Sequence, residues 1–285
     1  MPHPPLRSFH VGWICPLPTE HAAARTILDE DLGHLEGQEA EDPNVYTLGR
    51  IGNHYVVITC LLSGQRGSTP AATVAHEILR TFDPPYDIRQ GDIVISHGGV
   101  IRVSTGKGGE IQCMGGPLAS LHTQILTALV HMEFRQFTHG HRYPSYIQGA
   151  THHTQRTPRI FARPEHDSLY KIVHEHPKDA KDCDGGQPGW VHYGINASGD
   201  VLINSGDLRV ELREKRGASV FDKEAAGLMR DFPPIVIRGM SNYCDTPKDA
   251  QNAQWDGFAA LAAASYAKEL LGCIPSACLK EEAYK

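Results

Sequence analysis

An arginine flanked by two glycines, in the segment SGQRGST, has the chemistry of an anion-binding loop. Gly64 and Gly67 carry no side chain, so the backbone can approach a ligand closely at these positions. The planar guanidinium of Arg66 suits bidentate pairing with phosphate or carboxylate oxygens. The alternative is a solvated arginine, because isolated arginines usually face water. The segment is therefore a candidate anion site that needs support from the rest of the chain.

The 17 histidines of the sequence raise the question of a metal site. Zinc sites need ligands at defined spacing together with supporting partners. The segment HGHRYPSYIQGATHH contains no cysteine and no pair of histidines at helical spacing. We interpret it as a polar loop and expect no metal. The histidines gathered there are His139, His141, His152 and His153.

Strand and helix patterns alternate through the first half of the chain, which is typical of a layered α/β fold. Residues 10–17 predict a buried strand, and Thr19 is expected to cap a helical run over 21–32. Two β-rich runs separated by Gly52 and Asn53 predict a hairpin. Further apolar spacing predicts helices over 71–82 and 118–137 and a strand over 92–103.

The second half of the chain is less regular. Residues 138–190 are polar and rich in His, Pro and Gly, so we expect an irregular insertion with little core. A helical patch is expected over 219–232, a strand over 233–240, and an Ala-rich closing helix over 256–273 that stops at Gly272. No linker or internal repeat divides the chain, which predicts one domain over residues 1–285.

The composition narrows the class of protein. A hydrophobic content of 40% with 21% charged residues is ordinary for a globular protein. The net charge of −6 provides no electrostatic footprint for nucleic acid. No apolar run is long enough to span a membrane, and the N-terminus lacks the features of a signal peptide. Seven cysteines without a close CxxC pair fit reduced thiols, which favours a cytoplasmic location.

Four segments, taken in order, resemble the nucleoside phosphorylase and nucleosidase superfamily, in the fungal form of the type I purine nucleoside phosphorylases. The resemblance covers most of the chain and is weakest between residues 100 and 190. It implies a three-layer, Rossmann-like α/β sandwich around a mixed central sheet. It also implies cleavage of the bond between a nucleobase and ribose, by phosphate or by water. The segments are VGWICPLPTEHAAA, YTLGRIGNHYVVI with SGQRGSTPAATVA, FDKEAAGLM, and VIRGMSNYCDTPKDAQNAQWDGFAALAAASYAKELL.

The resemblance assigns roles to three polar residues. Glu20 lies where the nucleosidases keep a carboxylate that orients the attacking water, although a helix N-terminus favours an acid in any case. Glu224 matches the acid that grips the ribose hydroxyls, and a carboxylate suits this because it accepts two hydrogen bonds. Asn242 lies where many relatives have the aspartate that protonates the purine N7. Its amide can donate a hydrogen bond but cannot supply a proton.

Other residues match the superfamily by short segments. The sequence SGD at 198–200 resembles a part of the base pocket, which places Ser198 and either Leu202 or Ile203 beside the purine. Core packing is the alternative for these residues. A phosphate site would recruit arginines, so Arg50 joins Arg66 as a candidate. Asp245 could replace the missing acid, although a turn residue before Thr246-Pro247 is the simpler interpretation.

The sequence departs from the superfamily pattern in ways that bear on activity. Lys223 replaces a methionine that would give the sugar an apolar wall, and it would either place a charge beside the ribose or pair with a carboxylate and fill the pocket. Only residues 83–86 stand where relatives have a buried strand and a glycine-rich loop. Two of these four are proline, which cannot supply ladder N–H groups.

These observations leave three hypotheses. The first is an enzyme that cleaves purine nucleosides, with no cofactor, phosphate as an optional co-substrate, and a homo-oligomeric assembly as in the superfamily. The second is a catalytically inactive nucleoside-binding or sensor domain. The third is a phosphorylase-like scaffold recruited to another reaction in secondary metabolism. The expected partner is a small nucleoside-like ligand, although in the third hypothesis the former nucleoside pocket holds a different substrate. No nucleic-acid or membrane partner is expected. The first is the function we expect.

Overall fold

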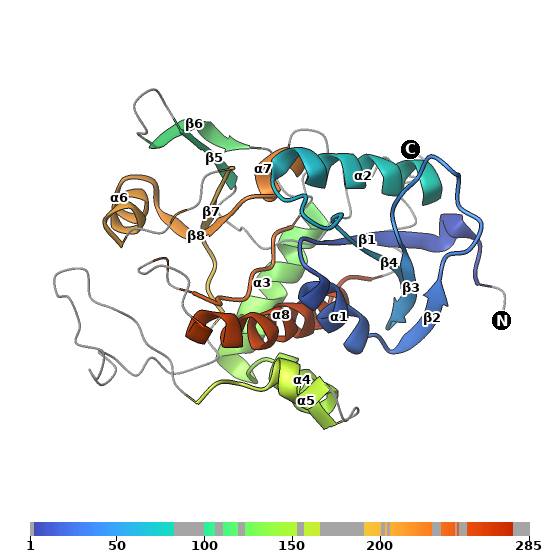
Figure 1. The fold of residues 1–285 in the computed structure, drawn as a ribbon. Helices are drawn as coiled ribbons and strands as arrows, with labels where there is room; N and C mark the ends of the chain where they lie inside the picture. The colour runs from blue at the N-terminus through green and yellow to red at the C-terminus, as the bar shows by residue number, and fades with distance from the viewer. Residues whose placement is uncertain are drawn as a thin grey trace.

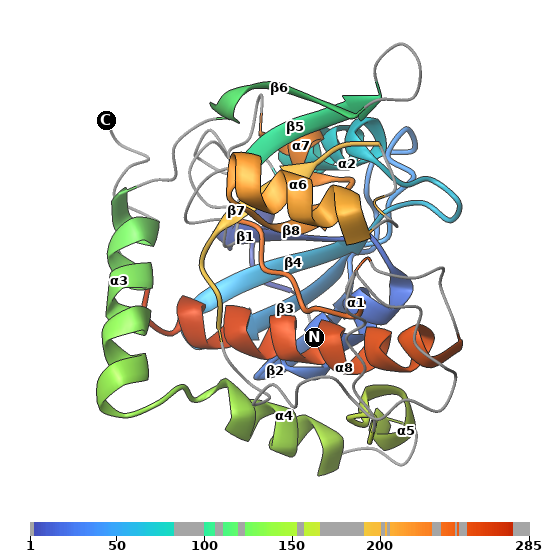
Figure 2. The same ribbon diagram turned by 90° about the vertical axis from the view of Figure 1, so that its left-hand side faces the viewer.

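A computed structural model shows how the chain folds (Figure 1). Helices cover a β-sheet on both of its faces, and a second sheet lies beside this arrangement (Figures 1 and 2). The structure describes residues 3–82, 100–105, 111–118, 123–152, 157–165, 191–200, 203, 206–229, 235–242, 244 and 250–275.

The first sheet has the strand order β1-β4-β3-β2. Its central strand β4 pairs in parallel with β1 and antiparallel with β3, and β2 extends the sheet antiparallel to β3. The expected hairpin is confirmed, with Gly52 at φ 56° in its turn. A left-handed conformation of this kind favours glycine, which has no Cβ to clash. The strands are β1 (Phe9–Cys15), β2 (Glu30–His34), β3 (Thr47–Ile51) and β4 (His54–Cys60).

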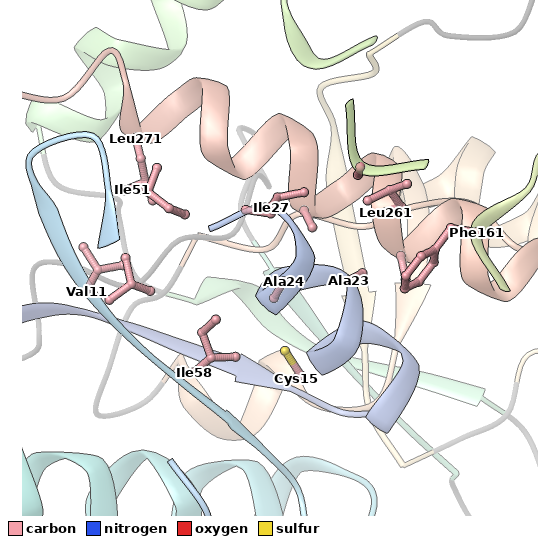
Figure 3. Packing of buried hydrophobic residues seen from close by; sticks show 14 residues of the cluster. Val11, Cys15, Ala23, Ala24, Ile27, Ile51, Ile58, Phe161, Leu261 and Leu271 are labelled. Carbon is pink, nitrogen blue, oxygen red and sulfur yellow. The ribbon is translucent and has the colours of Figure 1, made fainter. Parts of the chain in front are cut away.

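Alternate residues of the first sheet enter two different cores. Val56 and Ile58 pack with α1 (Pro18–Thr26) and α8 (Ala250–Leu271) on one face (Figure 3). Val57, between them, packs with α2 (Ser68–Phe82) on the opposite face. Side chains of a strand alternate between faces, so a sheet with both faces buried lies between two helical layers. The predicted three-layer α/β architecture with a mixed sheet is therefore confirmed.

The second sheet has the order β6-β5-β7-β8. Strands β5, β7 and β8 are parallel, and β6 is antiparallel to β5. Helix α6 (Gly206–Arg216) packs on β8 and contributes the buried Leu212 to the core of this sheet. The sequence did not predict α6, because its exposed face is almost entirely charged. The strands are β5 (Val100–Thr105), β6 (Ile111–Leu118), β7 (Ile195–Ser198) and β8 (Ala218–Asp222).

The remaining helices correct the prediction of an irregular insertion over 138–190. Helices α4 (Tyr143–His152) and α5 (Thr157–Phe161) pack on α8. They bury Tyr143, Ala150 and Phe161, so the beginning of this region is part of the core. Residues 153–156 and 166–190 lie outside the described part. The other helices are η1 (Leu6–Ser8), α3 (Thr123–Thr138), which confirms the helix expected over 118–137, and the short α7 (Ala225–Leu228).

Four other expectations about the secondary structure need correction. The helix expected over 21–32 ends at Thr26, because residues 30–34 pair with β3 as an edge strand. The residue before its first turn is Leu17 rather than Thr19, which lies inside the helix. The helical patch expected over 219–232 begins as strand β8, since these residues pair with β7. In the described part of the segment 233–240, only Val236 makes a bridge, so no strand forms there.

The closing helix α8 ends where the sequence predicts. The N–H of Gly272 bonds the carbonyl of Lys268, which ends α8 beside this glycine. None of the helices described here is long and apolar enough to cross a membrane. Over the same residues, no three His, Cys, Asp or Glu side chains lie close enough to hold a metal ion.

Candidate functional site

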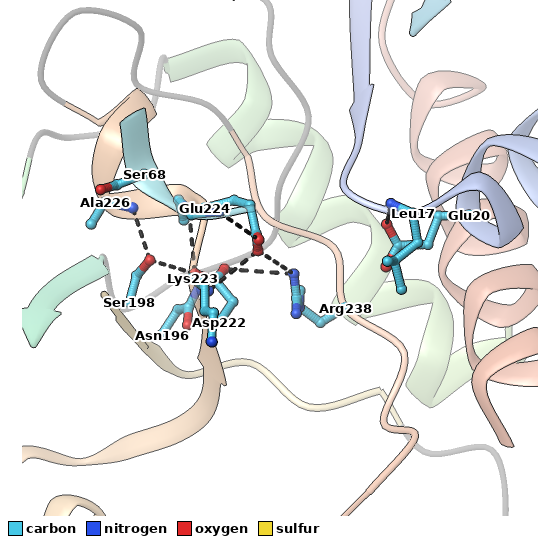
Figure 4. Close-up of polar contacts among 12 residues, drawn as sticks. Leu17, Glu20, Ser68, Asn196, Ser198, Asp222, Lys223, Glu224, Ala226 and Arg238 are labelled. Carbon is cyan, nitrogen blue, oxygen red and sulfur yellow. Dashed lines mark hydrogen bonds and ion pairs between the residues drawn. The ribbon is translucent and has the colours of Figure 1, made fainter. Parts of the chain in front are cut away.

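Polar groups from four parts of the chain surround the point where β8 leads into α7, with Glu20 set apart from the others (Figure 4). The loop before α2 contributes Gly67, and the connection after β1 contributes Glu20 at the start of α1. Asp222 ends β8, and Glu224 precedes the first residue of α7. The fourth part is the segment 235–242. Helices α1 and α2 pack on the first sheet, whereas β8 belongs to the second sheet. The site therefore depends on the whole fold.

Glu224 is held by the protein on both carboxylate oxygens. Its Oε1 accepts the N–H of Gly67 at 3.3 Å, and its Oε2 accepts the N–H of Lys223 at 3.3 Å. Oε2 also lies 3.8 Å from the guanidinium of Arg238. The side chain remains 11% exposed. A buried carboxylate fixed in this way is oriented for further hydrogen bonds without losing side-chain entropy on binding. The structure therefore brings together the predicted residues Glu224, Lys223 and Gly67.

Within the described part of the chain, the cation that pairs with Glu224 is Arg238 and not Lys223. The prediction that Lys223 pairs with a neighbouring carboxylate and fills the pocket stays open. Arg238 also lies 3.8 Å from Asp222, and 29% of its side-chain surface is exposed. Burial alone would lower the pKa of Arg238, but Asp222, Glu20 and Glu224 raise it above its usual value. Arg238 is consequently a permanent cation with surface open to a ligand.

Asp222 is the buried support of the site. Its carboxylate accepts the Asn196 amide at 2.6 Å and the N–H of Ala225 at 3.2 Å. It also accepts the hydroxyl of Ser198, which in turn accepts the N–H of Ala226 at 2.8 Å. Ser198 is fully buried and both of its hydrogen-bonding capacities are engaged. It therefore ties β7 to β8 and α7 instead of facing a purine, contrary to the prediction.

Glu20 lies on the other side of Arg238 (Figure 4). Its carboxylate accepts the N–H of Leu17 at 3.1 Å, which fixes it at the first turn of α1. Burial is the main reason why the pKa of Glu20 is raised, and the nearby charges of Glu224 and Asp256 raise it further. Arg238 and the Leu17 N–H oppose this effect. A carboxylate with a raised pKa is a better proton acceptor, as a general base requires.

Asn242 is oriented by a tight turn. Its Oδ1 accepts the N–H of Cys244 at 3.1 Å and contacts the Cys244 thiol at 3.4 Å. Cys244 has φ 56°, a left-handed conformation that costs of the order of 1 kcal/mol for a residue with a side chain. Because the oxygen of the amide is used in the turn, its Nδ2 is the end available to a ligand. The structure thus leaves Asn242 as a hydrogen-bond donor.

The loop before α2 is anchored by two carboxylates. Glu224 binds the N–H of Gly67, and Asp200 accepts the N–H and the hydroxyl of Ser68, each at 3.2 Å. Gly67 has φ 109°, and a Cβ there would lie 2.5 Å from Asp200, so only glycine fits. Arg66 precedes it and is exposed. Arg66 therefore stays a candidate for an anion at the edge of the site.

Other predicted site residues are not brought here. Arg50 pairs with Glu30 at 2.9 Å across strands β2 and β3, which gives it a structural partner instead of a phosphate. Ile203 is buried in the core of the second sheet. Leu202, Asp245 and the short connection at 83–86 lie outside the described residues, so those predictions stay open.

Sequence reasoning missed Arg238, although it lies in a segment singled out for its resemblance. A signal was present: an arginine interrupts the apolar run IVIRGM. A charge in such a run is costly unless a carboxylate compensates it. The sequence contains two acids with the same problem, in the strand-to-helix connection around Asp222 and Glu224. The ion pairs of Arg238 with the two acids offset the cost of burying all three charges.

Gly227 holds α7 against the start of α2. A Cβ at this position would lie 1.8 Å from the carbonyl oxygen of Ser68 and 2.4 Å from its carbonyl carbon. We expect Gly227→Ala to separate the two helices and to lower the free energy of unfolding by about 2 kcal/mol or more. Urea denaturation measures this. The matched control is Gly149→Ala in α4, where nothing lies within 4 Å of the new methyl group.

Gly149→Ala should leave stability unchanged or increase it by up to about 1 kcal/mol, because alanine favours a helix. Equal stabilities of Gly227→Ala and the wild-type protein would show that α7 and α2 can separate without cost.

The fold is similar to that of several solved nucleosidases. The 5′-methylthioadenosine/S-adenosylhomocysteine nucleosidase of Neisseria meningitidis aligns with a TM-score of 0.54 at 14% identity, over 92% of this chain and 97% of the enzyme. A putative nucleosidase of the same kind from Borrelia burgdorferi, bound to adenine, gives 0.55 at 14% identity over 92% and 99%. Futalosine hydrolase of Helicobacter pylori gives 0.53 at 10% identity over 93% and 98%. These similarities establish the nucleosidase-like fold. A specific relation to the fungal type I phosphorylases stays a prediction.

One protein that resembles this chain in sequence is not described as a nucleosidase. A nucleotide-binding leucine-rich repeat-like protein of Hyaloscypha variabilis is 34% identical over 95% of this chain. The chain spans only 30% of the length of that relative. The sequence matches no protein-family model.

Proposed function

We propose that this chain, which has the fold of the nucleosidases, hydrolyses the N-glycosidic bond of a purine nucleoside. The observation that carries the proposal is that Glu20 and Glu224, from distant parts of the chain, both lie close enough to Arg238 to raise its pKa. Two carboxylates and a cation that stay partly accessible match the needs of this reaction. One carboxylate must hold the sugar, and another must act on the nucleophile.

Each residue has a defined role in the proposed reaction. Glu224 accepts hydrogen bonds from the ribose hydroxyls, and the Gly67 N–H and Arg238 keep its carboxylate in place. Glu20 takes a proton from a water molecule that attacks the anomeric carbon as the bond to the base breaks. The Nδ2 atom of Asn242 donates a hydrogen bond to the purine, and this bond stabilises negative charge on the leaving base. The base then takes its proton from water, since an amide cannot supply one.

Water is favoured over phosphate as the nucleophile by the charges of the site. Asp222, Glu224 and Glu20 are three carboxylates around one arginine, which already lies 3.8 Å from two of them. A phosphate anion would meet net repulsion here. The N–H groups of Gly67 and Ser68, which could otherwise cradle an anion, bind carboxylates of the protein.

Base release from adenosine, inosine, guanosine and uridine, with and without phosphate, tests the proposal. We expect release from the purine nucleosides at a rate that does not depend on phosphate. A strict phosphate requirement would identify a phosphorylase and point to Arg66 as the anion contact. Absence of release from every nucleoside, by protein shown to be folded and homogeneous, would contradict hydrolysis.

The raised pKa of Glu20 predicts a distinctive pH dependence. Glu20 acts as the general base only when its carboxylate is ionised. Activity is therefore present above the pKa of Glu20 and is lost as the pH falls through it. Because burial raises the pKa of Glu20, the acid limb of kcat/KM should lie at a higher pH than for an ordinary glutamate. Glu20→Gln should remove both this limb and most of kcat. An acid limb that persists in the variant would assign it to another group.

A second candidate function is a nucleoside-binding sensor domain without catalysis. Two observations favour it: the relative of Hyaloscypha variabilis is described as a nucleotide-binding leucine-rich repeat-like protein, and Asn242 cannot act as an acid. Isothermal titration calorimetry with adenosine separates the candidates. Saturable binding that is weakened in Glu224→Gln, with no base released over hours, would support the sensor.

A further inference from the structure

The segment 235–242 leads from the core into the site and has a regular alternation of sides. Ile235 and Ile237 pack in the cluster between α3 and α8. Val236 packs in a different cluster, with Val100, Ala225 and Met229. Arg238 continues this second side and reaches Glu224. Odd and even residues of the segment therefore face opposite directions, as in an extended chain.

The alternation continues beyond Arg238. A Cβ at Gly239 would lie 1.9 Å from the carbonyl oxygen of Ala259, so this odd residue faces α8. Met240 is then on the same side as Arg238. It is 52% exposed, whereas the odd-side residues of the segment are covered by helices. The same alternation would place Asn242, two residues later, on this side. In the sequence, Met240 lies between Arg238, which supports the ribose carboxylate, and Asn242, whose amide is expected to meet the base.

We propose that the Met240 side chain is the apolar wall on which the purine base rests. This inference depends on the proposed function, because it assumes a nucleoside in the site. A thioether is polarizable and makes favourable contacts with aromatic rings, so it suits a flat heterocycle. Ser198 and Ile203 are both buried elsewhere, so neither of these two described residues supplies this wall. Met240 would also compensate for Lys223, which stands where the superfamily motif has a methionine.

Kinetics of two substitutions test the role of Met240. Met240→Ala should raise KM for adenosine about tenfold with little change in kcat, because the lost contact holds the base equally in the ground and transition states. Met240→Leu, which keeps the apolar volume, should stay close to the wild-type protein. The control is Phe137→Ala on α3, which removes a side chain that is 86% exposed on another element.

Oxidation of methionine provides a readout independent of catalysis. Dilute hydrogen peroxide should convert Met240 to its sulfoxide quickly, whereas Met132 and Met229, at 0% and 3% exposure, serve as slow internal references. Saturating adenine should slow the oxidation of Met240 and leave the reference rates unchanged. Mass spectrometry of peptides measures all three rates.

The outcomes separate this inference from the proposed function. If the wild-type protein releases base while Met240→Ala has an unchanged KM and adenine gives no protection, the wall is elsewhere and only this inference fails. If the wild-type protein neither binds adenine nor releases base, the proposed function fails and this inference falls with it. A raised KM together with protection supports both.

Discussion

Glu224→Gln is expected to reduce kcat/KM for base release by about 100- to 1,000-fold. The glutamine keeps the shape of the side chain but loses the charge that pairs with Arg238 and accepts the ribose hydroxyls. Removing one partner of a buried charged contact costs about 2–5 kcal/mol, and each 1.4 kcal/mol is a factor of ten. Steady-state kinetics with adenosine, or with the best substrate found, measures the loss.

The matched control is Glu211→Gln on α6, a glutamate that is 54% exposed and pairs with Lys215. It should behave as the wild-type protein, because exposed pairs contribute little. Thermal unfolding of both variants shows whether the fold is kept. A Glu224→Gln variant that is folded and fully active would exclude this carboxylate from ribose binding and contradict its role in the proposed reaction.

The second large effect concerns stability, at a place far from the site. Glu269 on α8 is 3% exposed, and its carboxylate accepts the N–H groups of Arg142 and Tyr143 at 2.8 Å each. These groups open helix α4 and have no partner within the helix. His141 lies 3.7 Å from the same carboxylate. Glu269→Ala should therefore lower the free energy of unfolding by about 3 kcal/mol, because it leaves buried donors unsatisfied.

The pH dependence of stability separates the charge of Glu269 from its shape. Burial would raise the pKa of Glu269, but His141 and the two N–H groups outweigh it, and the pKa lies below its usual value. A lowered pKa means that the carboxylate contributes stability above the unfolded-state pKa and loses it as the pH falls through the folded-state pKa. Glu269→Gln should lose this part of the acid dependence while keeping most of the packing.

Urea denaturation between pH 3 and 7 tests both variants, with the exposed Glu214→Ala on α6 as control. If Glu269→Ala is as stable as the control, then α4 is held by its apolar contacts alone. In that case hydrogen exchange should show no loosening of its first turn.

The sequence was sufficient for the layered architecture and for part of the site. The hairpin around Gly52 and the helices that carry an apolar face could be predicted, because periodicity and turn residues act locally. The sequence alone indicates both Glu224 and Gly67 as site residues, although 157 positions separate them. Their direct contact could not be predicted, because it depends on how α7 packs on α2.

The errors have a common physical origin. Residues 30–34 have good helix formers nearby but gain more by pairing with β3 than by extending a helix, and tertiary pairing overrides propensity in such cases. The motif around Ser198 predicts a ligand contact, because a motif cannot show which hydroxyl is already bonded to a buried carboxylate. The role of Asp222 as that carboxylate appears only when β7 and β8 lie side by side.

The site spans both sheets, and this has a thermodynamic consequence. Glu20 belongs to the helix packed on the first sheet, while Glu224 follows the last strand of the second and binds the loop that opens α2. A ligand held by both carboxylates stabilises both sheets through one binding equilibrium. At a free concentration 100 times its dissociation constant it would add about 2.7 kcal/mol to the folded state. Unfolding of either sheet would then release the ligand, so that occupancy makes the two parts of the molecule melt as one cooperative unit.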